Sequence, residues 1–132
     1  MRNIPEEYRG RGEFYFLKTM AEEIEKADYP PGATFSQESM LCVFRNFRSV
    51  FGPIFSDRCL KQKIKSLKKT YKEFSELLKE DNILWDKQNN IVYSDDELLS
   101  VKYKARYKNG VFRGEPNYDL MCVVFERGIN FE

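Results

Sequence analysis

The longest regular pattern of apolar and polar positions lies between residues 56 and 80. Apolar side chains recur there at alternating steps of four and three, the spacing that one face of an α-helix requires. The repeating residues are Leu60, Ile64, Leu67, Tyr71, Phe74 and Leu78. Because such a stripe has to be buried, the pattern predicts a long helix that packs on the rest of the chain and is capped by Ser56 or Asp57.

Two shorter helices are predicted before this long one. Apolar residues follow helical spacing over residues 13–27, and the sequence Pro30-Pro31-Gly32 ends that helix. Thr34 and Gln37 then form a capping-box pattern in front of a second helix, which runs to Phe51 before Gly52 and Pro53. The short connection that follows predicts close packing of the second and third helices.

The elements predicted after residue 81 are shorter. Two apolar runs separated by turn-forming residues indicate a small β-hairpin over residues 83–93. Ser94 and Glu97 form a second capping-box pattern, which predicts a fourth helix up to about Tyr107. Residues 111–116 are expected to form an irregular link.

The two ends of the chain are predicted to be less regular than its middle. Residues 1–12 combine proline and glycine with charges and are expected to form an irregular arm. A short fifth helix is expected over residues 118–125, capped by Asn117. Residues 126–132 are expected to fray, with residues 129–132 forming a tail outside the domain. A chain of this length favours a single domain, covering residues 13–128.

The distribution of charge adds a functional expectation. The chain has 132 residues, 42 % of them hydrophobic and 33 % charged, and a net charge of only +1, as in a soluble globular protein. Basic residues nevertheless gather in the third helix, without an acidic one between them: Arg58, Lys61, Lys63, Lys65, Lys68, Lys69 and Lys72. A merely solvated face usually mixes both signs, so this arrangement favours a polyanion such as double-stranded DNA.

The third helix supplies most of the candidate DNA-binding residues. The major groove, about 12 Å wide, admits one helix whose side chains reach phosphates and base edges. Near the helix start, Arg58, Lys61, Gln62 and Lys65 are best placed for bases. The remaining candidates are Lys68, Lys69 and Lys72, with Arg45 and Arg48 of the second helix as phosphate contacts or as ordinary exposed charges. A solvated lysine face without a ligand stays open as the alternative.

Several classes of function lack a basis in this sequence. It contains no histidine, which excludes Ser-His-Asp and Cys-His catalysis and histidine-ligated zinc, and it has no phosphate-cradling glycine loop. The acidic run Asp95-Asp96-Glu97 is interpreted as the first turn of a helix, Trp85 as a core anchor, and Cys42, Cys59 and Cys122 as small core residues. We therefore predict a non-enzymatic protein without catalytic residues, cofactor or metal.

The location of the protein can also be predicted. No apolar run approaches the length needed to cross a bilayer, and the charged start of the chain lacks the apolar core of a secretory signal. A cytosolic or nuclear protein is expected.

The order of these elements resembles the Myb/SANT-like domain family of plants and Harbinger-type transposon proteins. The resemblance covers about Tyr8 to Gly128, and its most specific residues are Leu84-Trp85-Asp86, Val92 to Glu97, Phe112-Arg113-Gly114 and Asn117 to Phe125. It implies a mainly α fold: a tri-helical Myb/SANT-like bundle with a long third helix, a small β-hairpin and additional C-terminal helices. Where the family carries tryptophans in its first two helices, and an aromatic residue in the third, this chain has Tyr8, Met40 and Ile64.

The resemblance implies two alternative functions. In the first, the third helix binds DNA in the nucleus, in a transcription or chromatin context. In the second, the chain is a SANT-type, transposon-derived protein-interaction module, with weak or no DNA binding and a partner in a nuclear complex. The second alternative predicts an exposed apolar patch near Trp85 or in residues 118–125.

Overall fold

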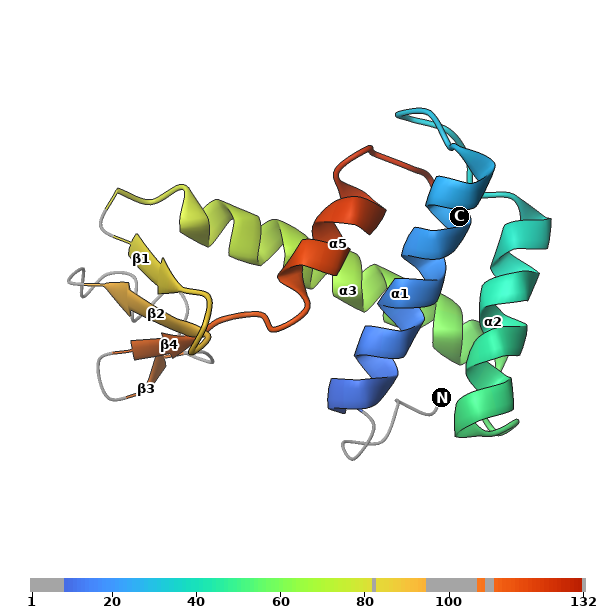
Figure 1. The fold of residues 1–132 in the computed structure, drawn as a ribbon, viewed down its shortest axis with the longest axis horizontal. Helices are drawn as coiled ribbons and strands as arrows, with labels where there is room; N and C mark the ends of the chain where they lie inside the picture. The colour runs from blue at the N-terminus through green and yellow to red at the C-terminus, as the bar shows by residue number, and fades with distance from the viewer. Residues whose placement is uncertain (1–8, 82, 95–106, 109–110, 132) are drawn as a thin grey trace. The chain divides into compact units, whose positions relative to one another are not determined.

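The chain folds into two compact units, which are described separately below (Figure 1). The structure is a computed structural model, and it describes residues 9–81, 83–94, 107–108 and 111–131. The first unit combines residues up to Lys69 with those from Asn117 onward, and the second comprises Thr70–Pro116. The predicted mainly helical class is confirmed, since the helices contain most of the residues in the described elements.

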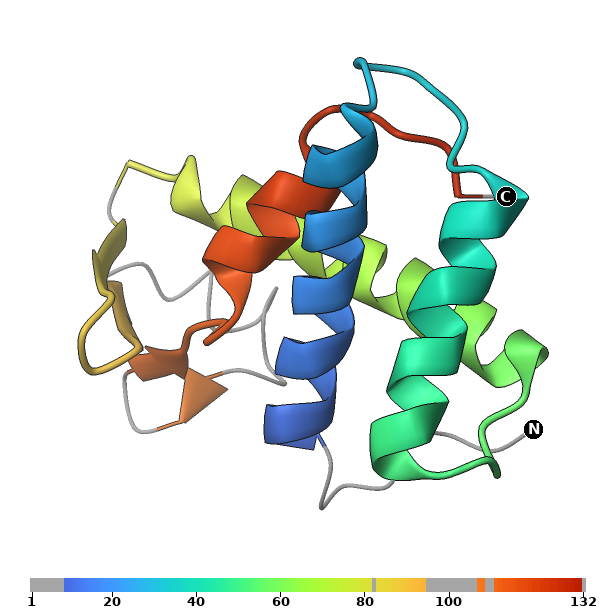
Figure 2. The same cartoon turned by 45° about the vertical axis from the view of Figure 1, so that its right-hand side comes forward.

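The first unit is built from four helical segments. These are α1 (Arg9–Ala27), α2 (Gln37–Phe51), the first part of α3 (Asp57–Leu78) and α5 (Tyr118–Phe125). Figures 1 and 2 show α1 between α2 and α5, with α2 antiparallel to α1 and the first part of α3 crossing them. The three helices predicted for residues 13–80 and the short helix predicted for residues 118–125 are therefore confirmed.

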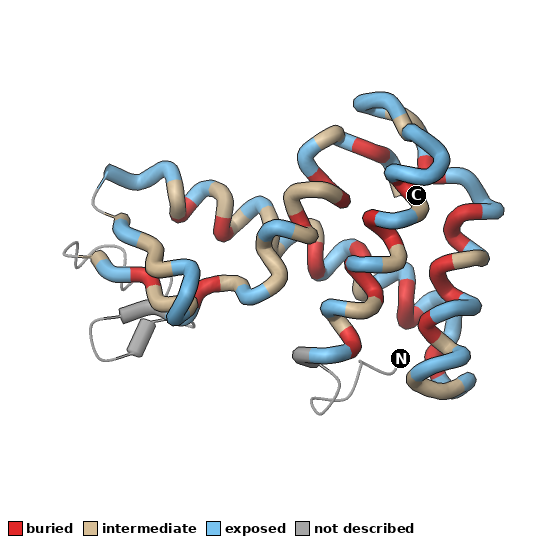
Figure 3. The backbone as a smooth tube through the Cα atoms, in the orientation of Figure 1, coloured by how far each residue is buried: buried red, intermediate tan, exposed pale blue. Residues whose placement is uncertain are grey.

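Aromatic rings fill the core of the first unit. The Phe47 ring packs edge-on against Phe16 and Phe55, with ring centroids 5.5 and 5.3 Å apart. Buried positions recur along one side of α1 and α2, as Figure 3 shows, and they include Met40. Ile64 is buried as well, so both residues, which stand where the resemblance implies aromatic side chains, belong to the core.

Three helix starts can be compared with the sequence-based predictions. α1 begins at Arg9 rather than at residue 13, and it runs through two glycines, of which Gly12 is buried. Tertiary packing thus outweighs the low helix propensity of glycine. α2 is capped by Ser36, whose Oγ accepts a hydrogen bond from Ser39 N, so the prediction of a Thr34 cap was wrong. α3 is capped by Ser56, as predicted.

The C-terminal segment does not fray as predicted. Residues 127–131, here called the strap, lie beside the loop between α1 and α2 through backbone hydrogen bonds from Phe35 N to Asn130 O and from Asn130 N to Ala33 O. Ile129 of the strap is 1 % exposed. Burial and pairing offset the entropy that a fraying tail would retain, so the strap is a fixed part of the first unit.

A four-stranded antiparallel sheet forms much of the second unit. Its strands are β1 (Ile83–Asp86), β2 (Ile91–Ser94), β3 (Tyr107–Lys108) and β4 (Val111–Arg113), in the order β1-β2-β4-β3. The predicted hairpin is confirmed as β1 and β2. The irregular link expected from residue 111 was wrong, because β4 pairs with both β2 and β3. The fourth helix predicted after Ser94 lies mainly outside the described residues, although its expected end at Tyr107 is instead in β3.

A close contact fixes the turn of this hairpin to the end of β4. Asn90, which has a φ of 55°, donates from Nδ2 to Gly114 O at 2.9 Å, and its backbone oxygen accepts from Gly114 N at 3.0 Å. The Trp85 ring lies next to it and packs edge-on against Phe74 of α3, with centroids 5.0 Å apart. A Cβ at Gly114 would lie 2.3 Å from Asn90 Oδ1 and 2.6 Å from Trp85 Nε1, so no larger residue fits without displacement.

We expect Gly114→Ala to lower the free energy of unfolding of the second unit by about 1–3 kcal/mol, because the added methyl group displaces Asn90 or the indole ring of Trp85. Urea unfolding followed by the fluorescence of Trp85, the one tryptophan in the chain, measures this. Gln88→Ala, at an exposed position of the same turn, serves as the control and should change stability by less than about 0.5 kcal/mol. A Gly114→Ala variant as stable as this control would contradict the contact.

Candidate nucleic-acid interface

The two faces of α3 follow from the burial of its apolar side. In the first unit, Leu60, Ile64 and Leu67 are 0 to 3 % exposed. At about 100° per residue, six basic residues occupy one arc of about 100° on the solvent side of the helix. These six residues, here called the basic face, are Arg58, Lys61, Lys65, Lys68, Lys69 and Lys72. All are exposed except Lys68, which is half-buried, and the exposed Gln62 borders the arc.

The seventh basic residue of the run lies elsewhere. Lys63 points to the opposite flank of α3, where its ammonium group forms an ion pair with Glu13 of α1. Both side chains are largely buried, with 17 and 21 % exposed. Lys63 therefore contributes to the joint between α1 and α3. Within the part of the chain that the structure describes, no carboxylate pairs with a residue of the basic face.

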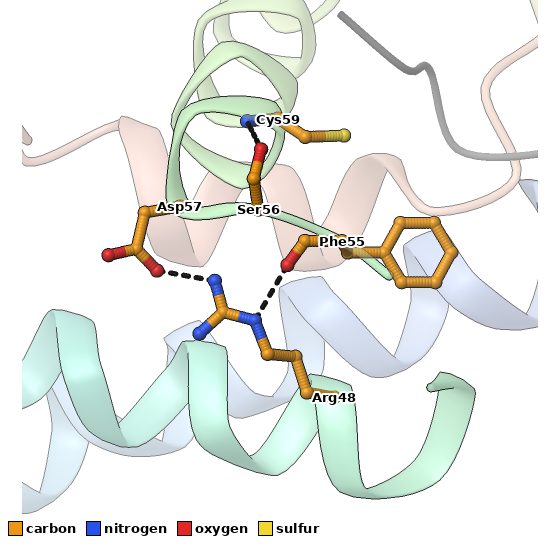
Figure 4. Close-up of polar contacts among 5 residues, drawn as sticks. All are labelled: Arg48, Phe55, Ser56, Asp57 and Cys59. Carbon is orange, nitrogen blue, oxygen red and sulfur yellow. Dashed lines mark hydrogen bonds and ion pairs between the residues drawn. The ribbon is translucent and has the colours of Figure 1, made fainter. Parts of the chain in front are cut away.

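The two candidate arginines of α2 differ in their surroundings. Arg48 reaches toward the start of α3, as Figure 4 shows, and forms an ion pair with Asp57 and a hydrogen bond to Phe55 O at 2.6 Å. Its guanidinium group thus closes the turn in which Ser56 caps α3, with Ser56 Oγ accepting from Cys59 N. Arg45 is exposed and points to solvent. Sequence spacing alone did not separate the two, because the partner of Arg48 lies nine residues further along the chain.

The basic face borders a groove in the first unit. One wall consists of Lys61, Lys65, Lys68 and Ile64 of α3, and the other of strap residues 128–131. The volume of this groove is about 560 Å³. The sequence predicted the lysine wall but not the strap wall, because the residues of the strap show no periodic pattern or functional motif. Their position depends on pairing with a loop almost 100 residues earlier in the chain, which no local signal predicts.

The positive charges of the basic face suit binding of a polyanion. Among the described residues, no group of cysteine and acidic side chains is placed to hold a metal ion. Cys59 is buried, whereas Cys42 and Cys122 are half-buried. None of the described helices is long and apolar enough to cross a membrane. What the surface offers is a row of cations at fixed positions on a rigid helix.

The protein-docking alternative predicts an exposed apolar patch near Trp85 or in residues 118–125, and the described residues of these two regions expose little apolar surface. In α5, every described apolar side chain is buried or half-buried. Trp85 is half-buried against Phe74 in the second unit. Two neighbours on adjacent strands, Leu84 and Tyr93, are 68 and 43 % exposed and form an exposed apolar pair on β1 and β2.

Comparison with known proteins gave one result. Residues 10–100 match the model of a family described as a Myb/SANT-like DNA-binding domain. The match includes α1, α2 and the whole of α3 with its basic face, together with β1 and β2. No curated protein and no solved structure matched the chain.

Replacing Arg48 by Gln should lower the free energy of unfolding by about 1–2 kcal/mol, because an ionic hydrogen bond and a second bond to the Phe55 carbonyl are lost at a half-buried site. The matched control is Arg45→Gln on the same helix, which should change stability by less than about 0.5 kcal/mol. Urea unfolding followed by far-ultraviolet circular dichroism compares the two. Equal losses of unfolding free energy in both variants would show that the contacts of Arg48 with Asp57 and Phe55 do not stabilise the protein.

Proposed function

The chain belongs to the Myb/SANT-like DNA-binding domain family, and on this basis we propose that it binds double-stranded DNA through the basic face of α3. The observation that carries the proposal is the separation of charge around this helix. Six cations share one solvent-exposed side, while the apolar side is buried in the protein. Each phosphate that such a face neutralises releases condensed counterions from DNA, which favours binding.

The proposed contact surface consists of residues from two helices. Its members are Arg58, Lys61, Gln62, Lys65, Lys68, Lys69 and Lys72 of α3, with Arg45 of α2 as a phosphate contact. The internal bonds of Arg48 support a structural role for that residue instead. The module predicted as residues 13–128 is proposed to include the start of α1 and the strap as well, because both belong to the first unit.

The wider setting of this function is part of the same proposal. We place the protein in the nucleus, as a non-enzymatic module of a transcription or chromatin assembly, because its family is described as a DNA-binding domain and the nucleus holds the chromosomal DNA. A relationship to transposon proteins fits the sequence resemblance described above. The modest net charge of +1 supports a role beside other DNA-binding parts, since isolated DNA-binding domains are usually more basic.

A second candidate function is docking of a protein partner. The observation that favours it is the exposed pair Leu84 and Tyr93 in the second unit, which offers a small apolar contact to another protein. The titration described next separates the two functions. A folded protein that does not bind duplex DNA even at low salt would leave protein docking as the better account.

We expect the affinity for duplex DNA to fall as salt rises, with a slope of log affinity against log salt of roughly −4 if four or five phosphates are neutralised. Fluorescence anisotropy with labelled duplex measures it. Reversing three charges of the basic face, in the variant Lys61→Glu/Lys65→Glu/Lys68→Glu, should abolish binding.

The control for this experiment removes the same amount of charge at another place. Lys18, Lys26 and Lys79 are exposed and lie outside the basic face. The variant Lys18→Glu/Lys26→Glu/Lys79→Glu should keep most of its affinity, because none of these three lysines belongs to the proposed contact surface. Equal loss in both triple variants would mean that net charge, and not the basic face of α3, determines binding.

A further inference from the structure

The basic face is not centred on the side of α3 that points away from the core. By helical spacing, Arg58, Gln62 and Lys69 lie nearly opposite the buried stripe. Lys61 and Lys68 lie on one flank, next to the buried Ile64, and form the wall of the groove there. The candidate DNA-binding residues of α3 thus include an outermost set (Arg58, Gln62 and Lys69) and a flanking set (Lys61 and Lys68), and the flanking set faces the strap.

The strap is a rigid wall for this groove. In addition to its pairing with the loop between α1 and α2, it is held by a hydrogen bond from Arg127 Nη1 to Tyr29 O at 3.0 Å. The Phe131 ring lies between the rings of Phe35 and Phe125, at centroid distances of 5.1 and 5.9 Å. The groove is therefore already formed in the absence of a ligand.

The strap also leaves the groove positively charged. The four strap residues that line it, residues 128–131, carry no charged side chain, so they do not neutralise the lysines opposite. Lys61, Lys65 and Lys68 span about 10 Å along the helix axis, at 1.5 Å per residue. A ligand for this groove is accordingly an extended anion with several negative charges.

We propose that the groove holds one phosphodiester strand of the duplex, and that the outermost set, Arg58, Gln62 and Lys69, faces the base edges. This inference rests on the proposed function. The reason is steric: a helix with side chains is about 10–12 Å wide and already fills a major groove of about 12 Å. The strap therefore cannot enter the major groove beside α3. It lies over the DNA backbone at the edge of the major groove, and one phosphodiester strand lies between the strap and α3.

The proposal changes the roles expected for two residues. Lys61 and Lys65 were expected to reach bases, because they are near the start of the helix. In the groove they contact phosphates, which position the protein and carry no sequence information. Sequence preference then depends on Arg58, Gln62 and Lys69.

The sharpest test adds one negative charge to the strap wall, outside α3. Gly128 has a φ of 68° and open space where a Cβ would lie, and Asn and Asp are the residues that tolerate this conformation best. The side chains introduced by Gly128→Asp and Gly128→Asn have the same shape and cause the same backbone strain, so the two variants differ in charge alone. We expect the Asp variant to bind a duplex with a randomised 20-base-pair core roughly fivefold more weakly than the Asn variant.

Asn130→Asp, compared with the unchanged protein, provides a second isosteric pair at the same wall and should weaken binding similarly. Gln88→Glu adds the same charge at an exposed residue that does not line the groove, and it should change affinity less than twofold. Melting curves identify any variant that is not folded. Equal affinity within both isosteric pairs, or an equal loss in Gln88→Glu, would overturn the proposal.

The division of roles within α3 is tested with the same randomised duplex, by sequencing the bound fraction. Lys61→Gln/Lys68→Gln should reduce the magnitude of the salt slope by about 1.8 and leave base preferences unchanged. Gln62→Ala/Lys69→Gln should remove preference at two or three positions. Altered base preferences in Lys61→Gln/Lys68→Gln, together with unchanged preferences in Gln62→Ala/Lys69→Gln, would overturn the assignment of phosphate and base contacts. If the unchanged protein does not bind at all, the proposed function fails, whereas binding that is insensitive to the strap variants refutes only the groove.

Discussion

The orientation of α3 about its own axis determines which of its side chains face solvent in the first unit. It is fixed by Leu60, Ile64 and Leu67, which the core buries almost completely. Burying each such side chain contributes about 1.5–3 kcal/mol to stability, so rotating α3 about its axis until they were exposed would be strongly unfavourable. Placing lysine ammonium groups in the core instead would add a large desolvation cost. The cations therefore point to solvent because of the apolar core.

Contacts distant in sequence then shape what lies around this face. Lys63 forms an ion pair with Glu13 of α1 and does not belong to the basic face. Arg48 forms an ion pair with Asp57 at the turn between α2 and α3. The strap is positioned by Ala33 and Phe35, so the C-terminal end of the chain becomes a wall beside the helix. The result is a cationic surface with a definite edge, which a bare helix does not have.

The elements predicted correctly are those specified by local patterns. The helices α1, α2, α3 and α5 and the β1–β2 hairpin have strong periodicity or clear turn residues, and their existence and type followed from the sequence. Strands β3 and β4 could not be predicted, because β4 depends on pairing with β2, about 20 residues earlier. For the site, sequence located the lysines but not the strap, and the choice between Arg45 and Arg48 required knowing where Asp57 lies. Such information is tertiary and leaves no periodic signal.

Chemical labelling of lysines, with and without duplex DNA, tests the central claim that the basic face of α3 is the DNA-contacting surface. Mass spectrometry after brief acetylation reports the reactivity of each lysine. The account predicts strong protection of Lys61, Lys65 and Lys69 by DNA, with the reactivity of Lys18 and of the paired Lys63 unchanged. Protection spread evenly over all lysines, or greater at Lys18 than in α3, would contradict it.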